Sequence, residues 1–221
     1  MNVHTVIFDL DGTLLDTTEG VVESARFAIK AMGFNEPTYD TLLKFVGPPI
    51  QNSFMNHFGC DENTAQKAAN IFRDYYKNEA LLRAVPYDGI FKLCDELKTR
   101  GKKLAVATYK REDYALSLLH HFGFEDFCDS MHGADNENVL KKSDIVSMCM
   151  RETGSKHSNT VLVGDTIHDA LGAERAGIFF IGVTYGFGFS RAEDLCGYSN
   201  SMAANNPHDI LQVIEQLEKQ G

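Results

Sequence analysis

The sequence predicts an α/β fold: a doubly wound parallel sheet of the Rossmann-like type, with an all-helical domain inserted into it. Short apolar runs alternate with segments of helical periodicity along most of the 221 residues, as expected when crossover helices join buried parallel strands. Glycines follow several of the helical segments, which is typical of helix ends. One long helical stretch breaks the alternation after the first apolar run, and this predicts the insertion.

The predicted strands are the apolar runs, each four or five residues long. They lie at residues 5–8, 103–107, 160–163 and 179–183, with a less apolar fifth strand at 127–131. The helices between them are predicted at 90–99, 113–121, 143–152 and 169–176. Each helix ends close to a glycine, which tolerates the left-handed backbone that closes many helices.

Residues 17–85 are predicted to form the insertion, a helical cap domain, and residues 1–16 and 86–221 the α/β core domain. Apolar residues recur at helical spacing from Val21 to Met32, and Pro48 and Pro49 precede a second helix that ends before Gly59. A third helix is predicted at about 65–75. The stretch contains seven Lys or Arg and eight Asp or Glu residues, so a nearly neutral cap is expected.

Composition excludes several classes of function. The formal net charge of −10 argues against binding to nucleic-acid polymers or to anionic membranes. The five cysteines are scattered, without a CxxC pair, as in reduced cytoplasmic proteins. No apolar stretch is long enough to span a membrane and the first residues lead directly into a strand, so a cytoplasmic protein is expected. The sequence does not indicate the oligomeric state, for which monomer or homodimer is the default.

Polar residues gather just after the predicted strands. Ligands of open α/β sheets bind at the carboxyl ends of the strands, so these residues are expected to share one crevice. They are Asp9 and Asp11 after the first strand, Thr108 after the second, Asp165 and Asp169 near "GDTIHD", and Lys141 or Lys142 before a helix.

This set of side chains predicts phosphoryl transfer. Several carboxylates in one crevice repel each other unless a cation lies between them, and oxygen ligands suit Mg²⁺. A metal ion and a lysine together bind phosphate. One carboxylate can then attack phosphorus, while a second acts as general acid and base.

The segments "DLDGT" and "GDTIHD", with a strand-end threonine and a lysine before a helix, resemble the four motifs of the haloacid dehalogenase (HAD) superfamily, in the same order. "FVGPP" and "VTYGFG" resemble its phosphoglycolate phosphatase-like branch. The resemblance implies a phosphoric monoester hydrolase with Mg²⁺ as cofactor and a small phosphorylated substrate. An aspartate at position 11 is typical of the phosphatases and mutases of the superfamily.

The resemblance also implies a role for each matching residue. Asp9 would be the nucleophile, and Asp11 the general acid and base. Asp9, the backbone carbonyl of Asp11, Asp165 and Asp169 would hold Mg²⁺, with Asp169 acting directly or through water.

The phosphate would be bound by Gly12, Thr108, Tyr109 and Lys142. Lys142 is preferred to Lys141 because "KSDIV" matches the branch's usual lysine. Lys110 is expected at the rim of the site.

Other interpretations remain open at this point. A β-phosphoglucomutase-type mutase, a pyrophosphatase and a 5'-nucleotidase would use the same core residues, and a non-catalytic binding protein would keep the fold without turnover. Asp9 and Asp11 could form an ordinary turn. Asp165 and Asp169 could simply cap a helix.

Overall fold

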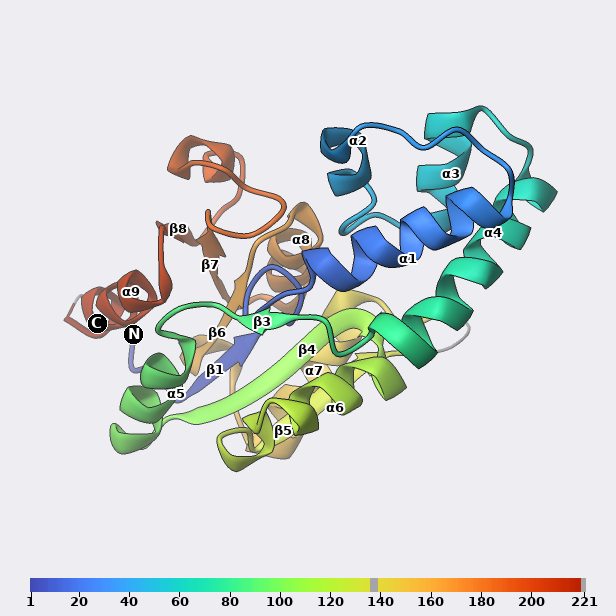
Figure 1. Cartoon of the computed structure of the whole chain (residues 1–221). Coiled ribbons are helices and arrows are strands. Elements are labelled where there is room, and N and C mark those ends of the chain that lie inside the picture. The colour runs from blue at the N-terminus through green and yellow to red at the C-terminus, as the bar shows by residue number, and fades with distance from the viewer. Residues whose placement is uncertain (136–138, 220–221) are drawn as a thin grey trace. The chain divides into compact units, whose positions relative to one another are not determined.

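The computed structural model describes residues 1–135 and 139–219 (Figure 1). The chain divides into two compact units. The first unit contains Met1–Leu15 and Pro86–Gly221, and the second contains Asp16–Val85. No helix among the described residues has the length and apolarity that crossing a membrane requires.

A six-stranded parallel sheet forms the centre of the first unit, with the order β5-β4-β1-β6-β7-β8. The strands are β1 (Thr5–Phe8), β4 (Lys103–Arg111), β5 (Ser130–Ala134), β6 (Thr160–Gly164), β7 (Phe179–Val183) and β8 (Ser201–Ala204). In the register of the central strands, Phe8 lies opposite Val106 of β4 and Val163 of β6. The chain leaves β1 in one direction and later returns to its other side, so the predicted doubly wound fold is confirmed.

Helices cover both faces of this sheet (Figure 1). One face carries α5 (Ile90–Thr99), α6 (Glu112–His121) and α9 (Pro207–Lys219), and the other carries α7 (Lys142–Thr153) and α8 (Ile167–Ala176). Short 3-10 helices occur at Phe124–Asp126, His157–Asn159 and Ala192–Leu195. Because both faces are covered, the strands are buried on both sides.

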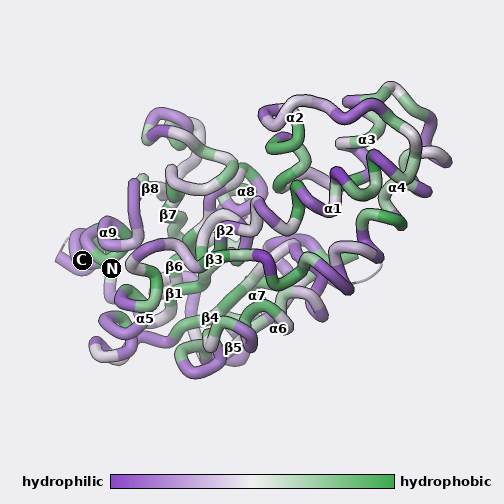
Figure 2. Tube along the Cα trace, viewed as in Figure 1, coloured by the Kyte–Doolittle hydropathy of each residue, from purple (hydrophilic) through white to green (hydrophobic). Residues whose placement is uncertain are grey.

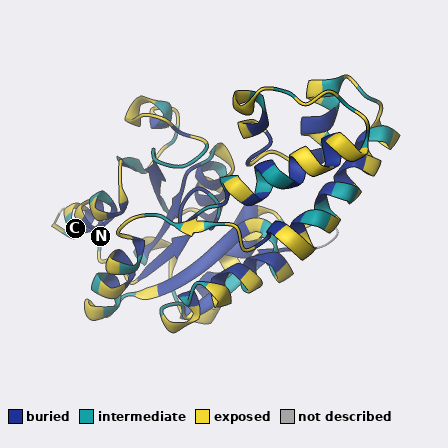
Figure 3. Ribbon diagram, viewed as in Figure 1, coloured by how far each residue is buried: buried dark blue, intermediate teal, exposed yellow. Residues whose placement is uncertain are grey.

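The core explains why the strands are recognisable in the sequence. All four residues of β1 and all five residues of β6 are buried, and the sheet is dark blue in Figure 3 and largely hydrophobic in Figure 2. Ile7, Ala105 and Leu162 pack in one cluster with Ile145 of α7 and Ala173 of α8. Strands buried on both faces read as continuous apolar runs rather than as alternating patterns.

The second unit is helical. It contains α1 (Thr18–Ala31), α2 (Tyr39–Leu43), α3 (Ile50–Phe58), α4 (Glu62–Tyr75) and a π-helical turn (Tyr76–Ala80). Helix α4 packs against α1 and α3, and Phe58 stacks on Phe34, with ring centroids 4.4 Å apart. Two short strands, β2 (Leu15–Asp16) and β3 (Val85–Pro86), pair where the chain passes between the units.

Three sequence predictions were wrong in detail. The fifth strand lies at Ser130–Ala134 rather than at 127–131, because Phe124–Asp126 form a 3-10 helix and the Asp129 side chain accepts a hydrogen bond from the Leu104 amide. Strand β4 continues to Arg111 rather than ending at 107, with an irregular register. Strand β8 and helix α9 were not predicted.

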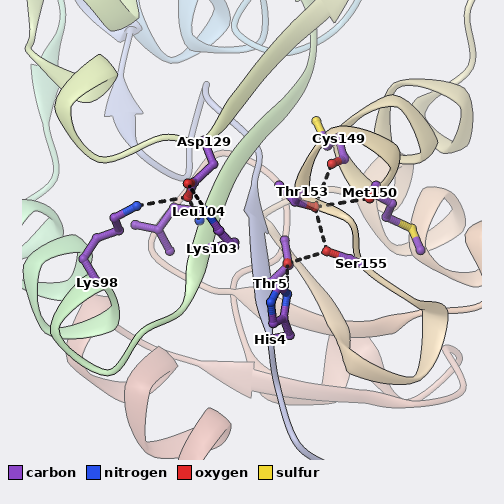
Figure 4. A network of polar contacts seen from close by, with 10 residues as sticks. All are labelled: His4, Thr5, Lys98, Lys103, Leu104, Asp129, Cys149, Met150, Thr153 and Ser155. Carbon is purple, nitrogen blue, oxygen red and sulfur yellow. Dashed lines mark hydrogen bonds and ion pairs between the residues drawn. The ribbon is translucent and has the colours of Figure 1, made fainter.

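Polar side chains at the amino-terminal edge of the sheet form hydrogen bonds with nearby residues (Figure 4). Asp129 accepts hydrogen bonds from Lys98, Lys103 and the Leu104 amide. Thr5, at the start of β1, is hydrogen-bonded to Ser155, just ahead of β6. The charged residues of this network are exposed or half-buried, whereas the buried charges of the described residues, Asp9, Lys142, Asp165 and Asp169, lie at the opposite, carboxyl edge.

Candidate active site

Three buried carboxylates meet at the carboxyl ends of β1 and β6. Asp9 follows β1 and Asp165 follows β6, and the Asp9 amide donates to the Val163 carbonyl at 2.8 Å. Asp169 lies on the first turn of α8. One carboxylate oxygen of each aspartate lies within 4.8 Å of the others. The parallel register thus brings together residues that are about 155 positions apart.

Lys142 lies between two of these acids. Its Nζ atom is 2.7 Å from Asp9 Oδ1 and 2.6 Å from Asp169 Oδ1, and its side chain is 2% exposed. Burial disfavours the charged ammonium, but Asp169 and Asp9 outweigh this effect and raise the pKa of Lys142 above its usual range. Lys141, by contrast, is exposed, so of the two adjacent lysines only Lys142 joins the cluster.

The carboxylates carry more negative charge than one lysine can balance. Burial raises the pKa of Asp9 to about 6, with Lys142 lowering it and Asp169 and Asp11 adding to the rise. Burial, together with the charges of Asp9 and Asp169, raises the pKa of Asp165 to about 8. Among the described residues Asp165 Oδ1 has no hydrogen-bond partner, although it is buried. A cation is the group that such a cluster of oxygens fits.

Asp169 has two functions in the local structure. Its Oδ2 atom accepts hydrogen bonds from the amide and hydroxyl of Thr166, at 3.0 and 2.6 Å, and so caps helix α8. Its Oδ1 atom pairs with Lys142. The helix-cap interpretation therefore holds for one oxygen of this residue, while the other belongs to the charged cluster.

Asp11 points to a different lysine. Its two carboxylate oxygens lie 2.9 and 3.1 Å from Lys110 Nζ. The Lys110 side chain is 9% exposed and that of Asp11 is 24% exposed. The two acids of "DLDGT" thus pair with different lysines, Asp9 with Lys142 and Asp11 with Lys110.

Gly12 is required by its surroundings. Its φ is +78°, a backbone conformation that favours glycine. A Cβ atom on Gly12 would lie 2.2 Å from Asp165 Oδ2. The Gly12 amide donates to the Leu15 carbonyl at 2.9 Å, so the residue brings the turn after β1 close to the end of β6.

Thr108 and Tyr109 lie in the second half of β4. Thr108 is buried, and its hydroxyl accepts a hydrogen bond from the Lys110 amide. The Tyr109 hydroxyl accepts a hydrogen bond from the Lys142 amide at 2.9 Å, and its ring contacts His168 edge-on. Thr108 therefore supports the backbone at Lys110 on β4, and Tyr109 supports the start of α7 at Lys142.

Sequence reasoning missed the residues that support the charged ones. Gly172 of α8 leaves room for Lys142, because a Cβ atom there would lie 2.5 Å from Lys142 Cγ. The amides of Phe187 and Gly188 donate to Asp165 Oδ2. Two glycines around Phe187, directly after a buried strand, were the available signal for this loop.

Known proteins resemble this chain along nearly its whole length. The model of the family described as haloacid dehalogenase-like hydrolase matches residues 6–183. A 5'-nucleotidase of Pseudomonas aeruginosa is 35% identical over 214 residues, covering 95% of each chain. A phosphoglycolate phosphatase of Agrobacterium fabrum is 32% identical over 188 residues, covering 82% of this chain and 80% of the relative.

The fold is also that of solved structures. The crystal structure of a predicted phosphatase from Clostridium acetobutylicum superposes with a TM-score of 0.86 at 33% identity, covering 98% of this chain and all of the other. Fold and sequence therefore point to one family.

Proposed function

The chain belongs to the haloacid dehalogenase-like hydrolases and is a phosphatase of that family, and we propose that it hydrolyses a small phosphorylated metabolite with Mg²⁺ as cofactor. The observation that carries this proposal is the buried group of Asp9, Asp165 and Asp169, joined by Lys142. Its excess negative charge suits a divalent cation, and the buried ammonium beside it suits a phosphate.

Asp9 is proposed as the nucleophile. One of its carboxylate oxygens attacks phosphorus, the bond between phosphorus and the ester oxygen breaks, and the phosphoryl group is carried on Asp9. Lys142 holds Asp9 Oδ1 at 2.7 Å and so orients the attacking group. The same ammonium is placed to balance charge on the phosphoryl oxygens.

Asp11 is proposed as the general acid and base. It gives its proton to the departing alcohol oxygen and then takes a proton from the water that attacks phosphorus, which releases inorganic phosphate and restores Asp9. Lys110 binds both oxygens of Asp11 and so fixes where this carboxyl group points. Thr108 and Tyr109 are proposed to contact the phosphate with Gly12.

Mg²⁺ would be held by Asp9, Asp165 and the Asp11 backbone carbonyl, with Asp169 directly or through water. When bound, the ion would neutralise the carboxylates and polarise the phosphate. Asp165 Oδ1, which has no hydrogen-bond partner in the described part of the chain, supports direct ligation. Both oxygens of Asp169 already have partners, which favours contact through water.

The substrate is proposed to be a phosphoglycolate-like monoester, with a nucleoside monophosphate as the second candidate because the 5'-nucleotidase relative matches 95% of the chain. The helical unit, Asp16–Val85, is proposed to be the cap that sets this preference. Exchanging residues 16–85 for those of the phosphoglycolate phosphatase relative would test this, since the preference should follow the exchanged segment.

The test of the function is phosphate release from a panel of esters with Mg²⁺ or with a chelator. The panel contains phosphoglycolate, nucleoside monophosphates, pyrophosphate, and glucose 1-phosphate with a bisphosphate primer. Release from a monoester that stops with chelator is expected, whereas isomerised sugar would indicate a mutase. No release from any ester would refute the proposal.

The nucleophile is tested separately with Asp9→Asn. The amide keeps the size of the side chain but attacks phosphorus poorly, so turnover should fall more than about 1,000-fold. Circular dichroism should show that the fold is retained. Turnover within tenfold of the unsubstituted protein would exclude Asp9 as the nucleophile.

A further inference from the structure

The loop after β7, residues 185–189, binds Asp165 through its backbone. The amides of Phe187 and Gly188 donate to Asp165 Oδ2 at 2.7 and 3.3 Å, and the Phe189 amide donates to the Asp165 carbonyl at 2.7 Å. Three consecutive amides of the loop are thus directed at one residue. Asp165 Oδ1, in contrast, has no hydrogen-bond partner among the described residues.

Glycines let the loop approach this closely. A Cβ atom on Gly186 would lie 2.3 Å from the Gly12 carbonyl oxygen and 2.5 Å from Asp165 Oδ2, and one on Gly188 would lie 2.3 Å from the Asp165 carbonyl oxygen. Neither glycine has a positive φ, so lack of space, rather than backbone conformation, is what requires glycine. Gly12 meets the same carboxylate at a would-be Cβ distance of 2.2 Å.

The loop is also fixed at both ends. The Tyr185 hydroxyl donates to the Thr13 carbonyl at 3.0 Å, and its ring lies against Tyr87, with centroids 4.7 Å apart. At the other end Phe189 is buried and contacts Phe180 and Tyr198. A loop held in this way cannot move away from Asp165 without breaking several contacts.

The arrangement leaves Asp165 with one oxygen, Oδ1, that no described residue contacts by a hydrogen bond. We propose that Gly186 and Gly188 are positioning residues that make Asp165 a one-oxygen metal ligand, and that the site thereby prefers Mg²⁺ to Ca²⁺. Mg²⁺ takes six single oxygens in a near-octahedral arrangement, whereas Ca²⁺ takes six to eight ligands and readily binds both oxygens of a carboxylate. The inference rests on the proposed metal site.

A methyl group on Gly186 would push the loop away from Asp165 and free Oδ2. The same holds for Gly188. Outer-sphere changes of this kind typically alter metal affinity about 10- to 100-fold. We expect Mg²⁺ affinity to fall about tenfold in Gly186→Ala and Gly188→Ala, with Ca²⁺ affinity unchanged or raised, so that the preference for Mg²⁺ decreases by about tenfold or more.

Isothermal titration calorimetry with Mg²⁺ alone and with Ca²⁺ alone measures the preference for Mg²⁺ over Ca²⁺ without any substrate. Gly182→Ala is the matched control, because its methyl group would meet the flexible Leu195 side chain at 2.5 Å rather than Asp165. Gly197→Ala is a second control, since nothing lies within 4 Å of its added Cβ. Both controls should keep the preference of the unsubstituted protein.

The outcomes separate the inference from the function on which it rests. If the unsubstituted protein binds no Mg²⁺, the proposed metal site fails. If it binds Mg²⁺ and the folded Gly186 and Gly188 variants keep its preference, only the inference fails. If both alanine variants fail to fold, Tyr185→Phe replaces them in the test, because it removes only the hydroxyl that binds Thr13. This variant should lower the preference for Mg²⁺ over Ca²⁺ about threefold. An unchanged preference overturns the inference.

Discussion

Replacing Lys142 by methionine tests the charged cluster most directly. Methionine keeps an unbranched chain of similar length in the space beside Gly172 but removes the ammonium. Asp9 and Asp169 then lose the partner that lies 2.7 and 2.6 Å away. Because the Asp9 and Asp169 side chains are only 10% and 1% exposed, water compensates poorly for the lost partner.

The expected cost follows from the burial of the pair. Removing one partner of a buried ion pair typically lowers the free energy of unfolding by about 3–5 kcal/mol. For a protein of this size each kcal/mol corresponds to about 2–4 °C in Tm. The variant should therefore unfold about 6–20 °C below the unsubstituted protein when both are metal-free.

The defect should also depend on pH. Without Lys142 the pKa of Asp9, already raised to about 6 by burial, rises further. A carboxyl group with a raised folded-state pKa binds more protons in the folded than in the unfolded state, so it stabilises the fold as pH falls toward its unfolded value of 3.8. Lys142 itself stays charged between pH 5 and pH 8, because its pKa is raised above 10.5, so the pH dependence of the deficit comes from Asp9. The deficit of the variant should therefore be larger at pH 8 than at pH 5.

Urea unfolding followed by circular dichroism, with a chelator present, measures both effects. Lys141→Met is the matched control, because the neighbouring lysine is exposed and surface substitutions usually change stability by less than about 0.5 kcal/mol. A Lys142 variant within about 1 kcal/mol of the unsubstituted protein at pH 8 would refute the reasoning. A deficit that grows as pH falls would refute it as well.

Two further predictions follow from the same cluster. Mg²⁺ binding at pH 7 should release about one proton, because burial and the charges of Asp9 and Asp169 raise the pKa of Asp165 to about 8 in the metal-free site. Titration calorimetry in two buffers of different ionisation enthalpy measures this proton release, and identical binding heats in the two buffers would contradict it. Gly172→Ala should lower the free energy of unfolding by about 1–3 kcal/mol, because its methyl group would meet Lys142 Cγ at 2.5 Å; unchanged urea unfolding would show that the two helices separate without cost.

The strands and most helix ends could be predicted because their causes are local. A strand buried on both faces shows as an apolar run, as at Thr5–Phe8. The helices α7 and α8 end at Gly154 and Gly177, both in the left-handed conformation. A single residue type therefore marks each of these ends in the sequence.

Other elements depend on contacts that the sequence does not display. The start of β5 is set partly by Asp129, whose side chain binds the amide of Leu104 on a neighbouring strand. Strand β8 is only partly buried, so it lacks the apolar run of a central strand. Helix α9 was missed for a different reason, because its start at Pro207 and the helical spacing of Ile210, Ile214 and Leu217 are visible in the sequence and were overlooked.

The same distinction applies to the site. The acids could be predicted from their positions after strands, whereas Lys142 was preferred to Lys141 because "KSDIV" resembles a family motif. The pairing of Asp11 with Lys110, about 100 residues away, and the space that Gly172 leaves for Lys142 arise only when distant segments fold together. No local sequence pattern indicates that these residues, distant in the chain, come into contact.

The position of β1 at the centre of the sheet has a consequence during synthesis. This strand is made before the other strands of the sheet, and its partners β4 and β6 begin about 100 and about 155 residues further along the chain. At a ribosomal rate of about 5–20 residues per second, the first partner arrives about 5–20 seconds later. During that time the segment that leads to Asp9 is an apolar strand with both edges unpaired, which is the kind of segment that aggregates. In the folded chain β2 and β3 pair at the two ends of the helical unit between these strands, so a helical unit that folded early would shorten the loop that β1 must close to reach β4.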